Sequence, residues 1–423
     1  MPLRRWITAL ALLSAAGLGA CRRADHTALP PGAVASTLPA TTPRVVMISL
    51  DGFRYDYINR PNARRLRALA ASGVRAERLV PSFPSKTFPN HYTLVTGLRP
   101  EQHGIVANHF RDPELGFFTL RDTIAQSDPR WWGGEPIWVA AERQGLRAAI
   151  VGWPGSEAPI GGRHATWWSR YDHELPRDVK VRRILDWLSI PASRAPSLIL
   201  GYFHEVDGAG HSYGPDSPQV DAAIAQVDSA LGALIDGIAR RGMADKVVLV
   251  IVSDHGMTAT SPQRLILLDD YIALEDVDVV DWAPVTQIEP KPGAEERVYA
   301  ALQRAHPALA VYRKGEVPVR YHFNANPRIT KLVAVAEDGW TIASRAQAQR
   351  WREQGWRGGG NHGYAPEVQA MGATFVVAGA GIPRGRVIPA FGNVHVVAVL
   401  GRLLGVSLGG SEARVDSVRL VFP

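Results

Sequence analysis

The chain is nearly free of cysteine. Cys21 is the only cysteine among 423 residues, which excludes a disulfide within one chain and any fold that depends on several disulfides. Dense runs of lysine and arginine are also missing, because the basic residues behind the net charge of +7 are scattered. This pattern favours a basic surface that attracts phosphorylated small molecules over a nucleic-acid interface, and it indicates no specific protein partner.

Internal repeats and low-complexity tracts are absent as well. Hydrophobic residues make up 46% of the chain and charged residues 21%, which is typical of a globular protein. At this length the chain forms one large domain with insertions or two domains. The 40 glycines and 31 prolines predict many turns and loops.

The apolar segment near the amino terminus is too short for a membrane span. Trp6–Ala16 follows a basic pair, Arg4-Arg5, and falls short of the roughly 20 residues that a helix needs to cross a bilayer. Leu18-Gly-Ala-Cys21 supplies small residues before the cysteine, which resembles a bacterial lipobox. We therefore predict a signal peptide over residues 1–20.

Cys21 is then expected to carry lipid and to begin a flexible tether over residues 21–43, which are rich in alanine, threonine and proline. Arg22 favours the outer membrane in the familiar sorting pattern. We expect a lipid-anchored protein of the bacterial cell envelope that faces the periplasm. The alternative is an ordinary secretory signal and a soluble periplasmic protein. From residue 44 to residue 423 we expect one domain.

Apolar runs alternate with helical patterns beyond the tether. Five runs predict strands: 45–50, 147–151, 198–203, 247–252 and 373–378. Continuous apolar runs are typical of strands buried on both faces of a parallel sheet. The predicted fold class is α/β, with a central, mostly parallel sheet flanked by helices. The segment from about 257 to 360 breaks the alternation, and we expect an inserted subdomain there.

One helix is marked at both ends. Ser217 is a favourable N-cap, Pro218 suits the first helical position, and Gly242 marks the stop. Apolar residues recur at helical spacing on one face: Val220, Ile224, Val227, Leu231, Leu234 and Ile238. Such a face packs on the core, and we assign it no other role.

Residues of metal-binding type follow the ends of the apolar runs or lie in glycine-bearing segments. In open α/β sheets, the carboxyl ends of strands carry the ligands and the chemistry. Three carboxylates, three histidines and one hydroxyl form this set: Asp51, Thr87, Asp207, His211, Asp254, His255 and His362. Carboxylate oxygens with imidazole nitrogens suit zinc. Two such sites about 3.5–4 Å apart are typical of two-metal phosphoryl-transfer enzymes.

Two of these groups have other interpretations when taken alone. Asp254 and His255 reach one site only if the chain turns, and Gly256 permits that turn; the alternative is a surface turn with a helix-capping aspartate. Asp207-Gly-Ala-Gly-His211 has two glycines between its polar ends. The glycines favour a loop folded around something small over a helical pair, and the alternative is a plain glycine-rich turn.

Thr87 lies just before a helix-like stretch, Tyr92–Thr96. A threonine hydroxyl becomes a useful nucleophile when a metal ion lowers its pKa, and a helix amino terminus favours a phosphoryl anion. The alternative role of Thr87 is the N-cap of that helix.

Several long motifs together resemble the nucleotide pyrophosphatase/phosphodiesterase family of the alkaline phosphatase superfamily, in its bacterial type. They occur in the family's order over roughly residues 44 to 400, and they are Lys86-Thr-Phe-Pro-Asn-His-Tyr-Thr-Leu-Val-Thr-Gly-Leu98, Pro100-Glu-Gln-His-Gly-Ile-Val-Ala-Asn108, Asp207-Gly-Ala-Gly-His-Ser-Tyr-Gly-Pro215, Ser253-Asp-His-Gly-Met257 and Asn361-His-Gly-Tyr364. The resemblance implies two zinc ions, one held by Asp51, Thr87, Asp254 and His255, and the other by Asp207, His211 and His362.

The resemblance also implies a mechanism and a substrate. Thr87 would attack phosphorus in line and give a nucleotidyl-threonine intermediate, which water hydrolyses. Asn108 and the backbone N–H of Phe88 would donate to a phosphoryl oxygen. An apolar groove would hold the base or second ester group, lined by Phe88, Leu120, Tyr171 and Tyr202. The implied activity is hydrolysis of nucleoside triphosphates to nucleoside monophosphate and pyrophosphate, and of other nucleotide phosphodiesters.

Three alternatives belong to the same superfamily and one lies outside catalysis. A sulfatase needs a cysteine or serine nucleophile in a motif that Thr87-Phe-Pro-Asn90 lacks. A phosphonate hydrolase with a similar threonine and zinc pair stays open, as does a phosphodiesterase that cleaves lysophospholipids. A lipoprotein that lost the chemistry is disfavoured, because every expected ligand is present. No phosphate-gripping arginine can be placed, which favours diesters over monoesters.

Overall fold

The computed structural model describes residues 26–29, 43–413, 419, 421 and 422. The predicted signal peptide, Cys21 and Arg22 lie outside the described residues, and lipidation stays a prediction. The four residues 26–29 pack on the domain, because the Trp187 and Trp167 indole nitrogens donate to the carbonyls of His26 and Ala28 at 2.8 and 2.9 Å. The rest of the predicted tether, residues 21–25 and 30–42, lies outside the described residues, and the tether stays a prediction.

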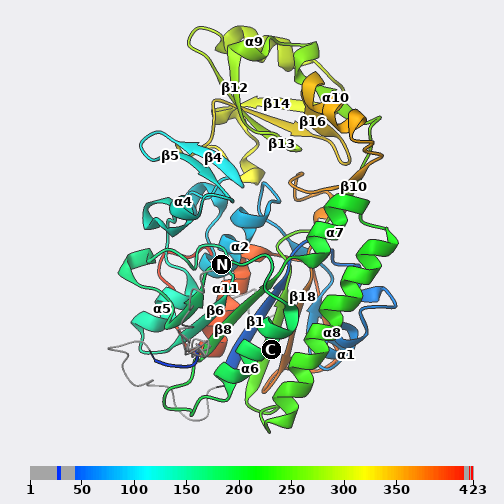
Figure 1. Ribbon diagram of the computed structural model, residues 1–423. Coiled ribbons are helices and arrows are strands. Elements are labelled where there is room, and N and C mark those ends of the chain that lie inside the picture. The colour runs from blue at the N-terminus through cyan, green and yellow to red at the C-terminus, as the bar shows by residue number, and fades with distance from the viewer. Residues whose placement is uncertain (1–25, 30–42, 414–418, 420, 423) are drawn as a thin grey trace, which may run out of the picture.

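A sheet of eight strands forms the centre of the fold, in the order β19-β2-β18-β9-β1-β8-β6-β7 (Figure 1). The strands are β1 (Arg44–Leu50), β2 (Val74–Ala76), β6 (Ala148–Val151), β7 (Trp167–Ser169), β8 (Leu198–Phe203), β9 (Val247–Val252), β18 (Phe375–Gly379) and β19 (Arg386–Ile388). The neighbours β8, β1 and β9 are parallel, whereas β18 is antiparallel to both β9 and β2. All five predicted strands and the mostly parallel α/β sheet are confirmed.

Helices cover both faces of this sheet. Along β1, Val45 and Met47 belong to one apolar cluster, and Val46 and Ile48 belong to the other. The first cluster includes residues of α2 (Thr87–Thr96), α5 (Ile137–Arg143) and α11 (Val396–Leu404), and the second includes residues of α1 (Arg64–Ala71), α6 (Arg177–Leu188) and α8 (Pro218–Arg240). Burial on both faces is the reason that these strands are apolar without alternation.

Helix α8 has the predicted cap, because the Ser217 hydroxyl accepts a bond from the N–H of Val220. The predicted apolar face is buried in the second cluster. By length and composition α8 is the one helix among the described residues that could cross a membrane, and half of its most apolar window is buried inside the protein. Its burial is that of a core helix.

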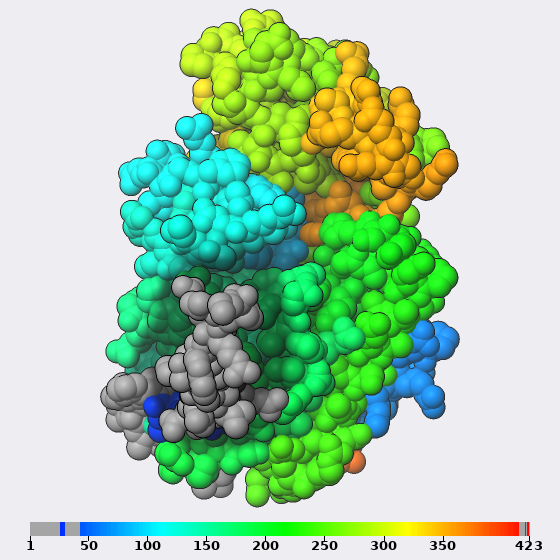
Figure 2. Space-filling view, viewed as in Figure 1, coloured from blue at the N-terminus to red at the C-terminus, as the bar shows by residue number. Residues whose placement is uncertain are grey.

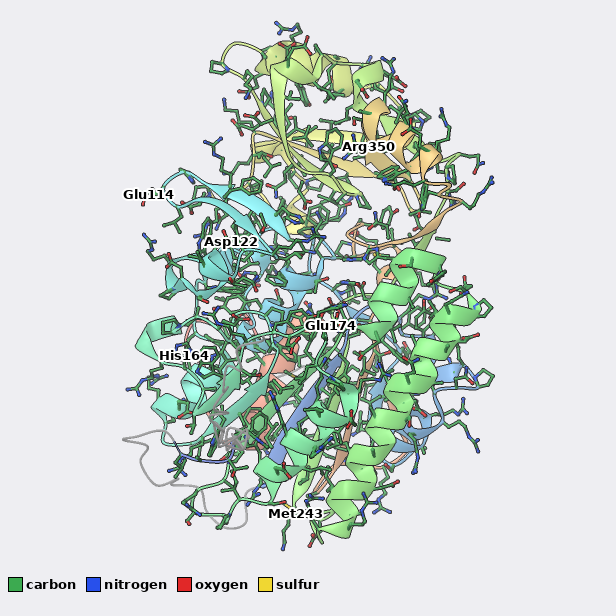
Figure 3. The ribbon with its side chains drawn as sticks, viewed as in Figure 1. Glu114, Asp122, His164, Glu174, Met243 and Arg350 are labelled. Carbon is green, nitrogen blue, oxygen red and sulfur yellow. The ribbon has the colours of Figure 1, made fainter. Side chains whose placement is uncertain are left out.

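The remaining elements around the sheet are short. They are α3 (Pro100–His103), α4 (Thr123–Ser127), α7 (Glu205–Tyr213), the hairpin of β4 (His109–Asp112) and β5 (Gly116–Thr119), and the pair β3 (Leu79–Val80) and β20 (Phe391–Gly392). Glu114 lies at the tip of the β4–β5 hairpin, which lies beneath a lobe above the sheet and points to the left in the view (Figure 3).

The lobe is made by the segment between β10 (Thr258–Thr260) and β17 (Gly359–Asn361), which pair antiparallel at its base. Its sheet has the order β12-β13-β15-β14, and β11 pairs with β16 beside it. The elements are β11 (Leu265–Leu267), β12 (Val277–Asp281), β13 (Val285–Pro290), α9 (Glu295–Leu302), β14 (Leu309–Arg313), β15 (Leu332–Ala336), β16 (Thr341–Ala343) and α10 (Arg345–Glu353). The lobe has its own apolar cluster and forms the upper part of the molecule (Figure 2).

The prediction of a loop over 207–211 is wrong. These residues lie in α7, so Asp207 and His211 are a helical pair one turn apart. Neither Gly208 nor Gly210 has a positive φ. The glycine at 210 serves close packing instead, because a Cβ there would lie 2.9 Å from Met257 Cε. Tertiary contact with β17 and Met257 therefore outweighs the low helix propensity of glycine.

Gly360→Ala should lower the free energy of unfolding by about 1–3 kcal/mol, the usual cost of overpacking. A Cβ at Gly360 would lie 2.5 Å from the backbone oxygen of Gly210, which cannot move without shifting α7. Gly208→Ala is the matched control. Its Cβ would meet nothing within 4 Å, so we expect no loss, or a gain of about 0.5–1 kcal/mol from the better helix former. Urea titration compares the two, and equal stabilities would contradict the packing argument.

Candidate active site

The predicted ligands meet at the carboxyl ends of the central strands. Asp51 directly follows β1, and Asp254 and His255 follow β9 after a single residue. Asp207 and His211 come from α7, which begins two residues after β8. His362 directly follows β17. Parallel strands β8, β1 and β9 are neighbours, so their ends place these side chains together.

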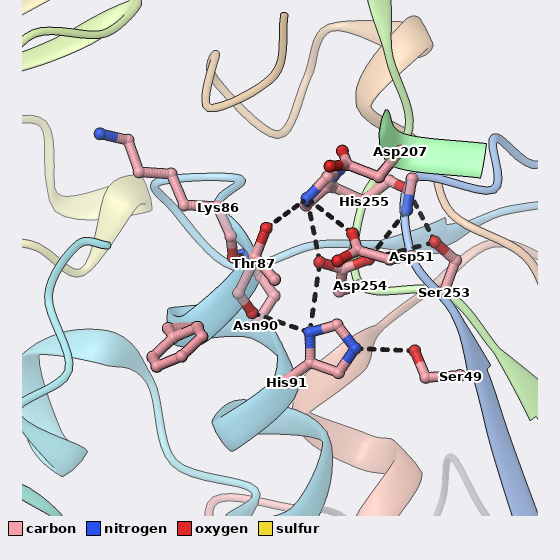
Figure 4. A network of polar contacts seen from close by, with 12 residues as sticks. Ser49, Asp51, Lys86, Thr87, Asn90, His91, Asp207, Ser253, Asp254 and His255 are labelled. Atoms are coloured by element: carbon pink, nitrogen blue, oxygen red, sulfur yellow. Dashed lines mark hydrogen bonds and ion pairs between the residues drawn. The ribbon is translucent and has the colours of Figure 1, made fainter. Parts of the chain in front are cut away.

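Asp51, Asp254 and His255 form a first, fully buried group. His255 Nε2 lies 2.9 Å from Asp254 Oδ2 and 3.5 Å from Asp51 Oδ1 (Figure 4). The N–H of Gly52 donates to the other oxygen of Asp254 at 3.2 Å. We expected Gly256 to provide a turn here. Its φ is not positive, and its lack of a side chain instead lets the backbone approach the carbonyl of Ala370, which would lie 2.0 Å from a Cβ.

Asp207, His211 and His362 form a second group. The Nε2 atoms of His211 and His362 are 3.1 Å apart, and Asp207 Oδ1 lies 3.4 Å from the first and 3.7 Å from the second. The two groups are in contact, because the His255 and His362 rings stack with centroids 3.5 Å apart. The structure therefore brings together all six carboxylates and histidines of the predicted set.

Each of the three histidines is held through Nδ1 by a backbone carbonyl. The pairs are His255 with Gly256 at 2.8 Å, His362 with Ser85 at 2.8 Å, and His211 with Gly360 at 3.0 Å. A carbonyl only accepts, so Nδ1 carries the proton and donates. In the neutral ring Nε2 then presents its lone pair to the interior of the site, which is the arrangement that metal-binding histidines adopt.

This donor set fits a cation. Asp51 Oδ1, Asp207 Oδ1 and Asp254 Oδ2 are buried and accept no hydrogen bond. Buried carboxylate oxygens without a donor are costly unless they coordinate a metal. The lone pairs of His211 and His362 face each other at 3.1 Å, which is also unfavourable without a positive charge between them. Both groups are therefore able to hold a metal ion.

Burial and neighbouring charges shift the pKa values of residues in both groups. Burial raises the pKa of Asp51 well above its ordinary value, and the Asp254 and Asp207 carboxylates raise it further. Burial also acts to raise the pKa of Asp254, but His255 and His91 outweigh it and hold that pKa well below the usual range. Burial, followed by the neighbouring histidines, lowers the pKa of His362. His362 is thus neutral and ready to act as a ligand.

Thr87 is the first residue of α2, and its hydroxyl lies 3.3 Å from His255 Nε2. Lys86 holds the N-cap position in an extended conformation. The alternative of Thr87 as N-cap is therefore wrong, and its hydroxyl is directed at the first group instead (Figure 4). The amino terminus of a ten-residue helix at this point favours an anion beside Thr87.

Asn108 is fixed beside Thr87 by one backbone bond. Its Oδ1 accepts from the N–H of Phe88 at 3.0 Å, and both residues line the same pocket. We expected Phe88 N–H and Asn108 to be two separate donors to a phosphoryl oxygen. In the structure the N–H is taken by Asn108, because the amide oxygen lies within its reach. The amide nitrogen of Asn108 is then the donor that this pair offers to a bound anion.

His91 supports the site, although no role was predicted for it. Its Nδ1 lies 2.9 Å from the carbonyl of Thr87 and 3.3 Å from Asp254 Oδ2, and its Nε2 lies 2.8 Å from Ser49 Oγ. His91 thereby connects β1, α2 and Asp254 (Figure 4). Its place four residues after Thr87 was the available signal, since residues so spaced share one face of a helix.

A cavity of about 280 Å³ opens beside these groups. All the predicted groove residues line it: Phe88, Asn108, Leu120, Tyr171 and Tyr202. Trp153, Gln126 and Glu157 also line it, and these were missed because they lie far from the recognised motifs. The described lining residues include no arginine or lysine.

Tyr202 differs from the other aromatic residues of the cavity. Its hydroxyl donates a short hydrogen bond to Asp51 Oδ2, and only 8% of the residue is exposed, whereas Tyr171 is 40% exposed. Burial, followed by the Asp51 carboxylate, raises the pKa of Tyr202, so the hydroxyl stays protonated and donates. Tyr202 therefore orients the Asp51 carboxylate. Phe88 and Tyr171 are the rings available to a bound group.

Comparison with known proteins identifies the family. A family model described as type I phosphodiesterase / nucleotide pyrophosphatase matches residues 45–365. An uncharacterized pyrophosphatase/phosphodiesterase of Schizosaccharomyces pombe is 38% identical over 372 residues, which are 85% of this chain and 76% of the relative. The bis(5'-adenosyl)-triphosphatase enpp4 of Xenopus laevis is 33% identical over 371 residues, 87% of this chain and 79% of the relative.

A solved structure has the same fold. It is murine ectonucleotide pyrophosphatase/phosphodiesterase 5, in an inactive threonine-to-alanine variant with AMP bound. The TM-score is 0.84 at 34% sequence identity, and the match covers 90% of this chain and all of the neighbour. The relatives named here are eukaryotic, and the expected bacterial lipid anchor gains no support from them.

A divalent cation should stabilise this protein, because it would satisfy the buried oxygens of the folded state only. At a hundredfold excess over the dissociation constant, linkage gives about 2.7 kcal/mol of stability. Tyr202→Phe removes the donor to Asp51 and should weaken cation binding about 10–100-fold. Titration calorimetry measures the affinity, with Tyr171→Phe as the matched control, since its hydroxyl contacts His173 and no predicted ligand. Equal affinity in both variants would show that the Tyr202 hydroxyl does not support the site.

Proposed function

The chain belongs to the type I phosphodiesterase / nucleotide pyrophosphatase family and is a hydrolase of the phosphodiesterase/pyrophosphatase class, and we propose that it cleaves nucleotide phosphodiester and phosphoanhydride bonds with zinc and a covalent threonine intermediate. One observation carries the proposal. The Thr87 hydroxyl lies 3.3 Å from His255 Nε2, beside three carboxylates that each have one buried oxygen without a hydrogen-bond donor.

We assign each group to one zinc ion. Asp51, Thr87, Asp254 and His255 would hold the first, and Asp207, His211 and His362 the second. Mixed carboxylate and imidazole ligands support zinc over magnesium or calcium, which prefer oxygen ligands. When bound, the pair of ions lowers the pKa of the attacking hydroxyl and neutralises charge on the attacking and leaving oxygens.

Thr87 supplies the nucleophile in this mechanism. Its oxygen attacks phosphorus in line, and the leaving group departs from the opposite side as the nucleotidyl-threonine ester forms. Asn108, held by Phe88 N–H, donates its amide N–H to a phosphoryl oxygen that gains charge in the transition state. Water then displaces Thr87 in a second in-line step. The inactive threonine-to-alanine variant of the murine neighbour supports the choice of a threonine nucleophile.

The substrate follows from the lining of the cavity. Phe88, Leu120 and Tyr171 offer an apolar slot that suits a nucleobase, and the murine neighbour binds AMP. The described residues that line the cavity include no arginine or lysine. This favours a diester substrate, because a monoester dianion needs an additional cation. We therefore propose ATP and nucleotide esters as substrates, with AMP and pyrophosphate as products from ATP. The lysophospholipid-cleaving phosphodiesterase is the second candidate, since the same slot accepts an acyl chain.

Thr87→Ala should lose nearly all turnover and still bind AMP, because it removes only the attacking oxygen. Thr87→Ser keeps that oxygen and should retain measurable activity. Two in-line displacements give overall retention of configuration at phosphorus, which a chiral thiophosphate ester reports. Inversion would rule out the covalent intermediate and leave Thr87 as a ligand only.

Tyr171→Ala should raise KM for p-nitrophenyl thymidine monophosphate by about 5- to 150-fold, which corresponds to one stacking contact of about 1–3 kcal/mol. Methyl p-nitrophenyl phosphate, which has no base, is the matched control substrate and should lose much less. Wild-type enzyme should prefer both diesters to p-nitrophenyl phosphate. A larger kcat/KM for lysophosphatidylcholine than for ATP and the thymidine ester would favour the second candidate.

A further inference from the structure

A buried ion pair joins the lobe to the residue before Thr87. Asp281, the last residue of β12, accepts a short hydrogen bond from Lys86 Nζ through Oδ2. Both side chains are almost fully buried, at 4% and 7% exposure, and Lys86 Nζ also lies 3.3 Å from the carbonyl of Val285. The lobe thus contacts the N-cap residue of the helix that begins with Thr87.

The second oxygen of the same carboxylate reaches the other side of the site. Asp281 Oδ1 lies 3.5 Å from Nδ1 of His109, the residue directly after Asn108. Burial acts to raise the pKa of Asp281, but Lys86 and then His109 outweigh it and hold that pKa below its ordinary value. Asp281 is therefore a carboxylate at neutral pH, with one oxygen toward each segment.

Lys86 does not direct its charge at the site. Its side chain extends away from Thr87 and the carboxylates (Figure 4), and the ammonium group is enclosed between the core and the lobe. A buried ion pair adds little to stability compared with apolar packing, whereas breaking it is costly. Such a pair is best explained by the geometry that it fixes.

We propose that Asp281 is a positioning residue, an inference that rests on the proposed function. Its two carboxylate oxygens fix the segment of Thr87 relative to the segment of Asn108. A direct link between those segments is the bond from Phe88 N–H to Asn108 Oδ1 at 3.0 Å. Asp281 adds a second link through the lobe. The inserted segment is then part of the catalytic geometry, although it contributes no ligand.

Asp281→Asn is the principal variant, because it keeps the shape and removes the charge. A misplacement of about 1 Å between reacting groups costs up to about 100-fold in rate, so we expect kcat to fall about 10- to 100-fold. KM should stay within about threefold, because the pocket is untouched. Asp112→Asn is the matched control. Asp112 pairs with Arg328 of the lobe segment at 2.7 Å and is similarly buried. Its other oxygen accepts from the N–H groups of Glu114 and Leu115, and none of these partners lines the cavity. We expect that variant to lower Tm with kcat within about threefold of wild type.

The double variant Lys86→Met with Asp281→Leu separates positioning from stability. It removes both charges, so Tm should recover toward wild type while kcat stays low. Recovery of kcat together with Tm would overturn the proposal, as would full kcat in folded Asp281→Asn. Turnover of p-nitrophenyl thymidine monophosphate by wild type, and its loss in Thr87→Ala, are measured alongside. If either of those fails, the proposed function is wrong; if both hold and Asp281→Asn is unaffected, only this inference is wrong.

Discussion

Buried negative charge at the ends of β1 and β9 is the constraint on which the site depends. Asp51 and Asp254 are enclosed by protein, and like charges so close cannot both ionise without compensation. The protein supplies part of that compensation through the Tyr202 hydroxyl, which donates to Asp51, and through the N–H of Gly52, which donates to Asp254. One oxygen of each carboxylate is left without a donor, and a bound cation would balance the charge of these oxygens.

The surrounding backbone is arranged to serve this centre. Carbonyls of Ser85, Gly256 and Gly360 each hold one histidine ring, and these three residues come from distant parts of the chain. Glycines at the junction of α7 and β17 allow the backbones to approach, so the base of the lobe lies against Asp207 and His211. The lobe and the sheet therefore both position residues of one site. Asp281 adds a further contact between the lobe and the segments around that site.

Predictions missed features where one residue can serve two structural roles. Glycines at 208 and 210 predicted a loop, but packing against Met257 and β17 made the segment helical. Gly256 allowed for a turn and instead permits close approach of another backbone. Tyr202 lines the cavity as expected, and its hydroxyl in addition reaches Asp51, which was not expected. In each case a contact with a residue distant in the chain decided the role, and the local sequence pattern does not predict such a contact.

The sequence by itself determined the central strands, helix α8, the mostly parallel sheet and the set of candidate metal ligands. These features can be predicted from local sequence, because a strand that is buried on both faces requires a continuous apolar run. Candidate ligands are then sought where such runs end. Only the tertiary structure decided the division of the candidate ligands into two groups of three and the tautomer of each histidine. It also decided the support from His91 and Tyr202, and the contacts of Asp281 with Lys86 and His109. Those features depend on distances of a few ångström between segments far apart in the chain, which are set by how the whole core and lobe pack, and no local periodicity encodes them.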